Sequence, residues 1–168
     1  MLNNFTVNFV EHSEVSSTLL NDIISLKQQH WPHSYNSQLD WINKNLNSND
    51  YHLLLMNNEG ELLGYMNLVH RIVNGNPVLG VGNVCINNVV LNKGIGTLLM
   101  QISKYYSNQL LLDLVLLCKI ELVPFYKKCG FYQYHKKVFM EEKVFDRCIM
   151  FSNDSYNLEN SITIDRNF

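Results

Sequence analysis

The segment from Val89 to Leu99 constrains the fold most, because two glycines, Gly94 and Gly96, join an apolar stretch directly to an amphipathic helix. The helix is predicted by apolar side chains at helical spacing: Ile95, Leu98, Leu99, Ile102 and Tyr106. Backbone amides in the first turn of a helix have no partners within it and lie at the positive end of its dipole. The pattern therefore predicts a strand–turn–helix unit that binds a phosphate or pyrophosphate group.

Three other interpretations of this glycine segment are a nucleotide P-loop, a dinucleotide-binding turn and a plain turn before a helix. A nucleotide P-loop requires the pattern G-x-x-x-x-G-K-[S/T], which is absent. A dinucleotide-binding fingerprint requires a third glycine where this chain has Leu99, and it normally lies in the first β-α unit. A glycine turn that merely starts a helix remains the alternative, because an isolated G-x-G is a weak signal.

The remaining patterns predict a mixed α/β (α+β) fold in one domain spanning residues 1–168, with helices packed on a mixed sheet. Alternating or continuous apolar segments predict strands at 1–10, 51–56, 62–72, 78–90, 110–119, 131–139, 147–152 and 161–165. Helices are expected at 17–29, after an N-cap at Ser37, from Ile95 onward, and at 121–129 with Gly130 at the C-terminal cap.

Composition excludes several classes of protein. The net charge of −2 lacks the basic excess that is typical of nucleic-acid binding, and the apolar run at 110–117 is too short to cross a membrane. The four cysteines include no C-x-x-C pair, and no Cys/His spacing fits a metal site, so reduced thiols in a cytoplasmic protein without a metal are expected.

Two motifs in order carry a resemblance to a known family. The loop Leu91-Asn92-Lys93-Gly94-Ile95-Gly96 is followed about 30 residues later by Tyr126-Lys127-Lys128-Cys129-Gly130-Phe131. In residues 50–140 the chain resembles the GCN5-related N-acetyltransferase (GNAT) superfamily, which has a [Q/R]-x-x-G-x-[G/A] loop after its fourth strand and a later Tyr-x-x-x-Gly-Phe pattern. Leu91 stands in place of the family's Gln or Arg, and Lys119 in place of its usual Asn.

The resemblance implies a mostly antiparallel mixed sheet with splayed fourth and fifth strands, and acetyl-CoA (coenzyme A) as cofactor. Its implied cofactor contacts are Val84, Cys85, Ile86, Leu91, Asn92, Lys93, Gly94, Ile95, Gly96, Thr97, Lys119, Phe125 and Lys128. Charge agrees with this, because residues 91–147 carry nine basic and five acidic side chains, whereas residues 1–90 carry three and seven. For any one lysine, an ordinary solvated side chain is the alternative interpretation.

The implied reaction is direct acetyl transfer to a primary amine of a small molecule. An amide near Val84 or Cys85 would stabilise the oxyanion, with Gly82-Asn83 as a bulge, and Tyr126 would protonate the leaving thiolate. No acidic residue lies between Glu61 and Asp113, so His70 and Asn83 are the candidates to orient a water as base. We interpret Cys85 and Cys118 as small buried hydrophobes rather than as nucleophiles.

The acceptor side is expected to use Trp31, Tyr35, Asp40 and Asp165. A fainter similarity to aminoglycoside 2′-N-acetyltransferases rests on Trp31-Pro32-His33-Ser34 and on the tail Ile164-Asp165-Arg166-Asn167-Phe168. Packing between helices around Trp31 and Trp41 is the alternative role for the aromatic residues. A non-catalytic acyl-CoA-binding module is the alternative function, and a homodimer is the expected assembly if the chain is not a monomer.

Overall fold

The computed structural model describes residues 5–140 and 147–168, which form two compact units. The first unit comprises the chain up to Val69 together with Asn83–Leu99, and the second comprises His70–Gly82 and Met100–Phe168. Strands β3 (Leu62–Val73) and β4 (Asn76–Ile86) and helix α3 (Ile95–Gln109) contribute to both units. The single-domain organisation stays a prediction.

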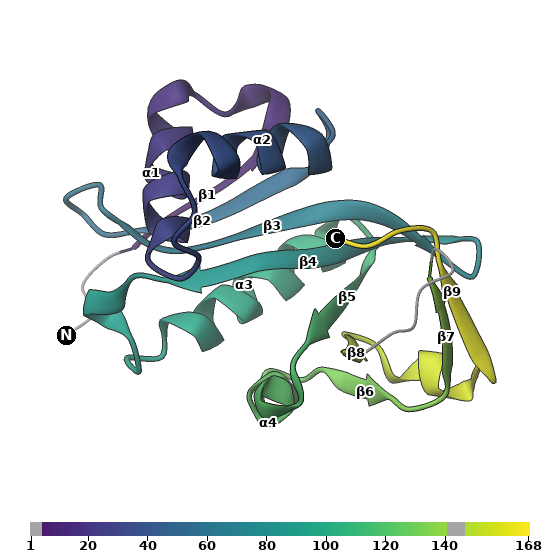
Figure 1. The fold of residues 1–168 in the computed structure, drawn as a ribbon. Coiled ribbons are helices and arrows are strands. Elements are labelled where there is room, and N and C mark those ends of the chain that lie inside the picture. Colours follow the sequence, from purple (N-terminus) through teal and green to yellow (C-terminus); the bar gives the residue numbers. More distant parts are fainter. Residues whose placement is uncertain (1–4, 141–146) are drawn as a thin grey trace. The chain divides into compact units, whose positions relative to one another are not determined.

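The first unit is a three-stranded antiparallel sheet with helices on it. Strand β1 (Thr6–Glu11) pairs with β2 (Tyr51–Met56), which pairs in turn with β3. Helices α1 (Ser17–Gln28) and α2 (Tyr35–Asn45) lie on the same side of these strands (Figure 1). Strand β2 is buried from His52 to Leu55 without alternation, because both faces of the sheet are covered. The first residues of the predicted strand 1–10 lie outside the described residues.

The second helix begins three residues earlier than predicted. Ser34, not Ser37, is its N-cap, since the Ser34 hydroxyl accepts a hydrogen bond from the Ser37 amide at 3.2 Å. Two serines at this spacing both satisfy the capping preference, and the geometry of the preceding loop selects the first. Tyr35 is therefore a helical residue rather than a loop residue.

The second unit adds strands β5 (Asp113–Cys118), β6 (Tyr132–Tyr134), β7 (Lys137–Met140), β8 (Cys148–Phe151) and β9 (Ser161–Ile164), and the short helix α4 (Val123–Lys128). β4 and β5 are parallel, whereas β8 is antiparallel to both β5 and β6. The hydrogen-bonded strand order is β1-β2-β3-β4-β5-β8-β6. The predicted mixed, mostly antiparallel sheet is confirmed.

The β4–β5 ladder ends early. It runs from Val78↔Asp113 to Val81↔Leu116, although β4 continues to Ile86. The last five residues of β4 therefore extend beyond the ladder, which agrees with the predicted splay of the fourth and fifth strands.

Several predicted boundaries are corrected. β4 ends at Ile86 instead of Val90, and β5 starts at Asp113 because Leu111, with φ of 57°, breaks the chain direction after α3. The predicted strand at 131–139 is two strands, since β6 pairs with β8 whereas β7 pairs with β9. The predicted helix at 121–129 is a 3-10 turn at Ile120–Leu122 followed by α4. Gly130, with φ of 79°, ends α4 as predicted.

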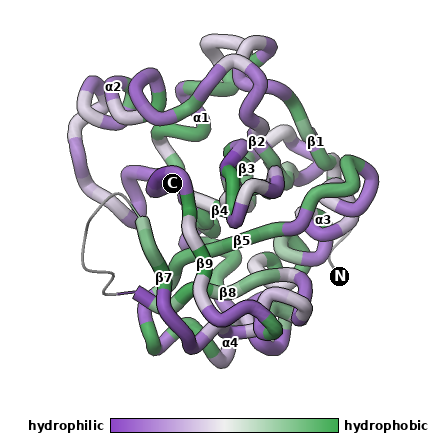
Figure 2. The backbone as a smooth tube through the Cα atoms, turned by 90° about the vertical axis from the view of Figure 1, so that its right-hand side faces the viewer, coloured by the Kyte–Doolittle hydropathy of each residue, from purple (hydrophilic) through white to green (hydrophobic). Residues whose placement is uncertain are grey.

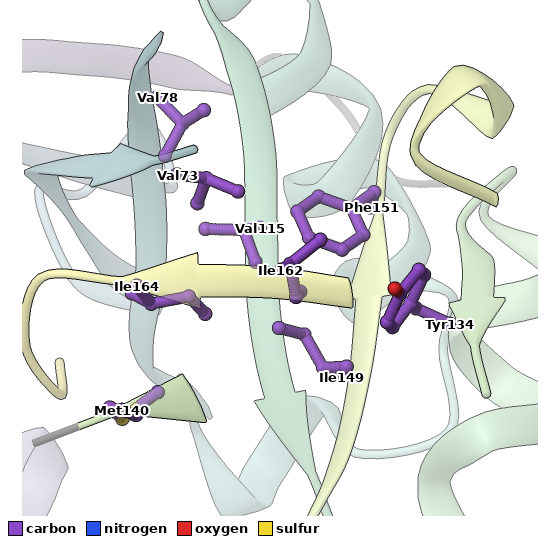
Figure 3. Close-up of a cluster of buried hydrophobic side chains, with 9 residues drawn as sticks. All are labelled: Val73, Val78, Val115, Tyr134, Met140, Ile149, Phe151, Ile162 and Ile164. Carbon is purple, nitrogen blue, oxygen red and sulfur yellow. The ribbon is translucent and has the colours of Figure 1, made fainter. Parts of the chain in front are cut away.

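The second unit has its own apolar core (Figure 3). Its buried members come from strands throughout the unit: Val73, Val78, Val115, Tyr134, Met140, Ile149, Phe151, Ile162 and Ile164. The colouring of Figure 2 shows the same contrast at the level of elements, with β5 largely hydrophobic and α2 largely hydrophilic. Ile162 and Ile164 belong to β9, so the late segment predicted at 161–165 is an integral strand.

Candidate active site

The glycine loop lies in the first unit between β4 and α3. Asn87 caps a 3-10 turn at Asn88–Val90, with its side-chain oxygen accepting from the Val89 amide. The chain then passes through left-handed conformations at Asn92 (φ 59°) and Gly94 (φ 83°) before α3 begins at Ile95. A left-handed backbone at Gly94 is favourable only without a side chain.

The first turn of α3 presents unused donors. Its first helical hydrogen bond joins the Leu98 amide to the Gly94 carbonyl at 3.0 Å. Within residues 5–140 and 147–168, the amides of residues 94–97 donate to no acceptor. A Cβ placed on Gly94 would meet no atom within 4 Å, so the space beside the loop is open. Unpaired amides, an open approach and the helix dipole together fit a phosphate group.

Two side chains of the glycine loop, those of Lys93 and Leu91, offer little to a phosphate in this conformation. The Lys93 ammonium donates to the Val89 carbonyl at 3.0 Å, which folds this lysine back along the loop. Leu91, where the GNAT pattern has Gln or Arg, is 44% exposed and supplies no polar group. Binding of a phosphate by this loop therefore depends mainly on the backbone amides.

The end of β4 is tied to the end of α1. The His30 ring nitrogen Nε2 lies 2.6 Å from the Ile86 carbonyl oxygen, and the Asn88 amide donates to the Gln29 side chain at 2.9 Å. Asn83 has φ of 51°, so the strand is irregular at the point where a bulge is predicted. These bonds fix the segment from Val84 to Ile86, the predicted edge for the cofactor.

A buried polar cluster beneath α1 was missed by the sequence interpretation. Its hydrogen bonds run from His12 Nδ1 to His52 Nε2 at 2.9 Å, and from His52 Nδ1 to the Tyr65 hydroxyl at 2.8 Å. The Lys27 ammonium lies 4.4 Å from the centroid of the Trp41 ring. Trp41 is thus used in helix packing, as the alternative interpretation of the aromatic residues expects. In the sequence, the helical spacing of Lys27 with Leu19, Leu20, Ile23 and Ile24 is the one signal that places it on the apolar face of α1.

Burial shifts the protonation of this cluster. Desolvation lowers the pKa of Lys27 to about 8, and desolvation, His12 and Lys27 together lower the pKa of His52 to about 3. Desolvation also raises the pKa of the Cys85 thiol to about 12, although Lys27 opposes this. Cys85 is therefore a protonated, buried thiol, which agrees with its interpretation as a small hydrophobe.

One side-chain amide of the first unit is incompletely satisfied. Asn83 Nδ2 donates to Asn67 Oδ1 at 2.8 Å, whereas Asn67 Nδ2 has no partner and is fully buried. A buried donor without an acceptor costs about 1–3 kcal/mol. It is the one such side-chain atom among the described residues.

In the second unit, Tyr126 lies on α4 among aromatic rings. Its ring meets Phe125 at a centroid distance of 5.0 Å and Phe131 at 6.2 Å, both edge to face. Burial, with smaller contributions from Cys118 and Cys129, raises the pKa of the Tyr126 phenol to about 12. Its hydroxyl makes no hydrogen bond to any residue the structure describes. The phenol is thus protonated at neutral pH and able to donate.

The other residues of the second unit that were predicted to bind cofactor or to act in catalysis differ in their exposure. Lys119 and Lys128 are exposed, and Phe125 is half-buried. His70 is half-buried, and its carbonyl accepts from the Arg71 guanidinium at 2.7 Å. Tyr126 and His70 belong to the second unit, whereas Asn83, the β4 edge and the glycine loop belong to the first.

The residues predicted to bind the acceptor belong to both units. Trp31 and Tyr35 are 38% and 41% exposed in the first unit, the Tyr35 hydroxyl donates to Asn21, and Asp40 is exposed. Asp165 lies in the second unit, where its carboxylate accepts from the Ile72 amide at 3.0 Å. No described contact joins Trp31, Tyr35 and Asp40 into one cluster.

The chain after β9 is anchored rather than frayed. The Arg71 guanidinium, 3% exposed, donates twice to the Asn167 carbonyl, at 3.1 and 2.8 Å. The Phe168 ring fills the space above Gly80 of β4, where an added Cβ would lie 2.7 Å from Cγ of that ring. Gly80 is therefore required for this close approach of the tail to the strand.

Comparison with known proteins identifies the class. A family model described as an acetyltransferase (GNAT) domain matches residues 13–145. The chain belongs to the GNAT family of acyl-CoA-dependent N-acyltransferases, a family that binds acetyl-CoA. No curated protein matches the chain.

Solved structures with this fold share little sequence with the chain. Escherichia coli ElaA is 19% identical with a TM-score of 0.66, covering 88% of this chain and 98% of its own. Escherichia coli YhbS, in complex with CoA, is 13% identical with a TM-score of 0.68, covering 97% and 89%. A mutant of Vibrio cholerae SpeG, a spermidine N-acetyltransferase, is 20% identical with a TM-score of 0.62, covering 92% and 96%. These likenesses establish the fold.

Three kinds of feature are absent from the residues that the structure describes. Among the described residues, no three His, Cys, Asp or Glu side chains gather as ligands for a metal ion. None of the helices described is long and apolar enough to cross a membrane. All four cysteines lie within the described residues, and none forms a disulfide.

Proposed function

We propose that this protein transfers the acetyl group of acetyl-CoA directly to the primary amine of a small molecule. The observation that carries the proposal is the row of unused amides at residues 94–97, at the N-terminus of α3 and beside open space. A pyrophosphate is a dianionic ligand that such amides and the helix dipole bind well. The basic side chains Lys119 and Lys128 are exposed and available for further phosphate contacts.

Acetyl-CoA supplies an activated acyl group and a thiolate leaving group. The protein has two tasks, which are to stabilise negative charge on the carbonyl oxygen and to protonate the departing sulfur. The amide of Val84 or Cys85 is our candidate for the first task, because β4 extends there beyond its ladder with β5. Tyr126 is our candidate for the second, because its phenol is protonated and makes no described hydrogen bond.

An enzyme is favoured over a non-catalytic acyl-CoA-binding module. A module would need only the phosphate loop and the strand edge. Tyr126, however, is 7% exposed, and its hydroxyl makes no hydrogen bond to a described residue, so it is available to donate to a bound group. His70 and Asn83 stay as candidates to orient a water that accepts the proton of the amine. SpeG, a structural relative, is named for acetylating the polyamine spermidine, which agrees with a small amine as acceptor.

The phosphate loop can be tested by adding a charge. We expect Gly96→Asp to weaken CoA binding about 5- to 1,000-fold, since a carboxylate near 4 Å from a phosphate repels it by about 1–4 kcal/mol. Isothermal titration calorimetry with CoA measures the change. The matched control is Asn58→Asp, which adds the same charge at an exposed residue of the β2–β3 turn in the same unit. Equal affinity of both variants for CoA would place the pyrophosphate elsewhere.

The anchored tail suggests that Asp165 contributes to the acceptor site, as in the aminoglycoside-like interpretation. Deleting residues 161–168 would remove the core residues Ile162 and Ile164, so a finer change is needed. Asp165→Asn keeps a side-chain oxygen for the Ile72 amide but removes the charge. If Asp165 faces an ammonium group, the acceptor's KM should rise about 10–100-fold, because a charge-assisted bond is worth about 1.5–3 kcal/mol.

The KM for acetyl-CoA should stay unchanged in this variant. Asp154→Asn is the control, because it removes a charge elsewhere in the second unit, at a carboxylate that accepts from Asn157. Steady-state kinetics with the best amine decide the matter. An unaltered acceptor KM in Asp165→Asn would leave Asp165 only its bond to Ile72.

A further inference from the structure

The feature that calls for an explanation is the side-chain amide of Asn67 on β3. It is 1% exposed and lies directly opposite His52 in the β2–β3 register. Its oxygen is held by Asn83 at 2.8 Å, but its Nδ2 has no hydrogen-bond partner among the described residues. Buried donors are nearly always satisfied in folded proteins, so a missing acceptor indicates a bound group.

The neighbouring side chains cannot supply the acceptor. Both ring nitrogens of His52 are already engaged, one with His12 and the other with the Tyr65 hydroxyl. No other described side chain supplies an acceptor to this atom. The acceptor for Asn67 Nδ2 must therefore come from outside the described side chains, as a water or as an oxygen of a ligand.

The position of Asn67 favours a ligand. Its partner Asn83 directly precedes Val84, the start of the strand edge proposed to hold the thioester, and is fixed in a left-handed conformation. Lys27 acts electrostatically on both His52 and Cys85, so positive charge lies close to this part of the sheet. A donor in positive surroundings suits an oxygen that gains negative charge better than a neutral water.

We propose that Asn67 Nδ2 donates to the carbonyl oxygen of the bound acetyl group, as a second donor beside the β4 backbone amide, and that Asn83 positions it. The proposal rests on the proposed function, since it assigns a residue to the same site. Asn67 acts on the negative charge that develops as the amine attacks, and Asn83 contributes to this stabilisation through its bond to Asn67. Loss of one such donor typically lowers kcat about 10²–10³-fold.

The test follows the carbonyl itself. Acetyl-CoA labelled with ¹³C at the carbonyl is bound to wild type and to Asn67→Leu, and its C=O stretch is recorded by isotope-edited infrared difference spectroscopy. We expect a lowered frequency in wild type that returns toward the solution value in the variant. Calorimetry should show the affinity for acetyl-CoA falling about tenfold relative to that for CoA, which has no carbonyl to bind. Asn45→Leu is the matched control, because Asn45 is a half-buried asparagine of the first unit bonded to Trp41.

The outcomes separate this inference from the proposed function. An unchanged C=O stretch and an unchanged affinity ratio in Asn67→Leu would mean that Asn67 holds only a buried water, and the inference would fail alone. If wild type binds no acetyl-CoA, the proposed function fails and this inference with it. If circular dichroism shows that Asn67→Leu does not fold, Asn83→Ala is measured instead. This variant keeps the Asn67 side chain but removes the hydrogen bond that positions it. A C=O stretch as in wild type would then overturn the proposal.

Discussion

Replacing Tyr126 with phenylalanine is expected to lower kcat about 10²–10⁴-fold while leaving the affinity for acetyl-CoA near that of wild type. The change removes one hydroxyl and keeps the ring that packs against Phe125 and Phe131. The hydroxyl is the only part of the side chain that can give a proton to the departing thiolate. Because the pKa of this phenol is raised to about 12, it stays protonated throughout the range of pH in which such an assay is made.

The measurement is steady-state kinetics with detection of released thiol, together with titration of acetyl-CoA. Tyr132→Phe is the control, because Tyr132 belongs to the second unit and is 45% exposed. An alkaline limb in the pH profile of wild type below about pH 10 should persist in Tyr126→Phe, since Tyr126 does not titrate there. A variant with full kcat and an intact fold would return Tyr126 to a packing role.

Helices and turns were predicted best, because their structure depends on residues that are close together in the sequence. The apolar period of α3 predicted its buried face in part: Ile95 and Leu99 are buried, whereas Leu98, Ile102 and Tyr106 are half-buried. The face also buries Met100, Ser103 and Ser107, which the apolar period did not select. The pair Asn74-Gly75 is typical of a tight turn, and in the β3–β4 turn both residues have positive φ, at 50° and 80°. Gly130 was expected at the C-terminal cap of a helix, and it adopts the left-handed backbone that such a cap needs.

Long-range pairing decided the parts that were predicted wrongly. Residues 131–139 were predicted as one strand because local propensity does not show that β6 and β7 have different partners, namely β8 and β9. β4 was predicted to reach Val90, but the Asn87 side chain closes a turn by donating to the carbonyl of Leu62, the first residue of β3 and 25 residues earlier in the chain. Local sequence carries no information on such a partner.

The sequence selected only those residues of the candidate site that belong to short local motifs. The glycine loop and Tyr126 carry short motifs, so sequence was sufficient to select them. Asn67, Lys27 and His52 carry none, and each resembles an ordinary strand or helix residue in its local sequence. Their roles come from burial and from partners on other elements, such as Asn83 for Asn67 and Trp41 for Lys27.

The stability of the protein is expected to fall by about 2 kcal/mol between pH 7 and pH 5 because of His52 alone. The pKa of His52 is about 3 in the folded protein, lowered mainly by burial and further by His12 and Lys27, against about 6.5 when unfolded. Between these two values the unfolded chain binds a proton that the folded protein does not. Stability from this group is therefore complete above about pH 6.5 and declines as the pH falls toward about 3.

Urea unfolding at pH 7, 6 and 5 measures this dependence, with His52→Gln as the test variant. Glutamine cannot titrate but can still bond to the Tyr65 hydroxyl, so the loss of stability between pH 7 and pH 5 should shrink by about 2 kcal/mol. His33→Gln is the control, since His33 is exposed on the loop before α2. Carboxylates that titrate in this range are the same in all three proteins, so their effect cancels in the comparison. If His52→Gln loses as much stability as wild type between pH 7 and pH 5, the His12–His52–Tyr65 chain accommodates a proton on His52. Burial would then not keep the His52 ring neutral in the folded protein.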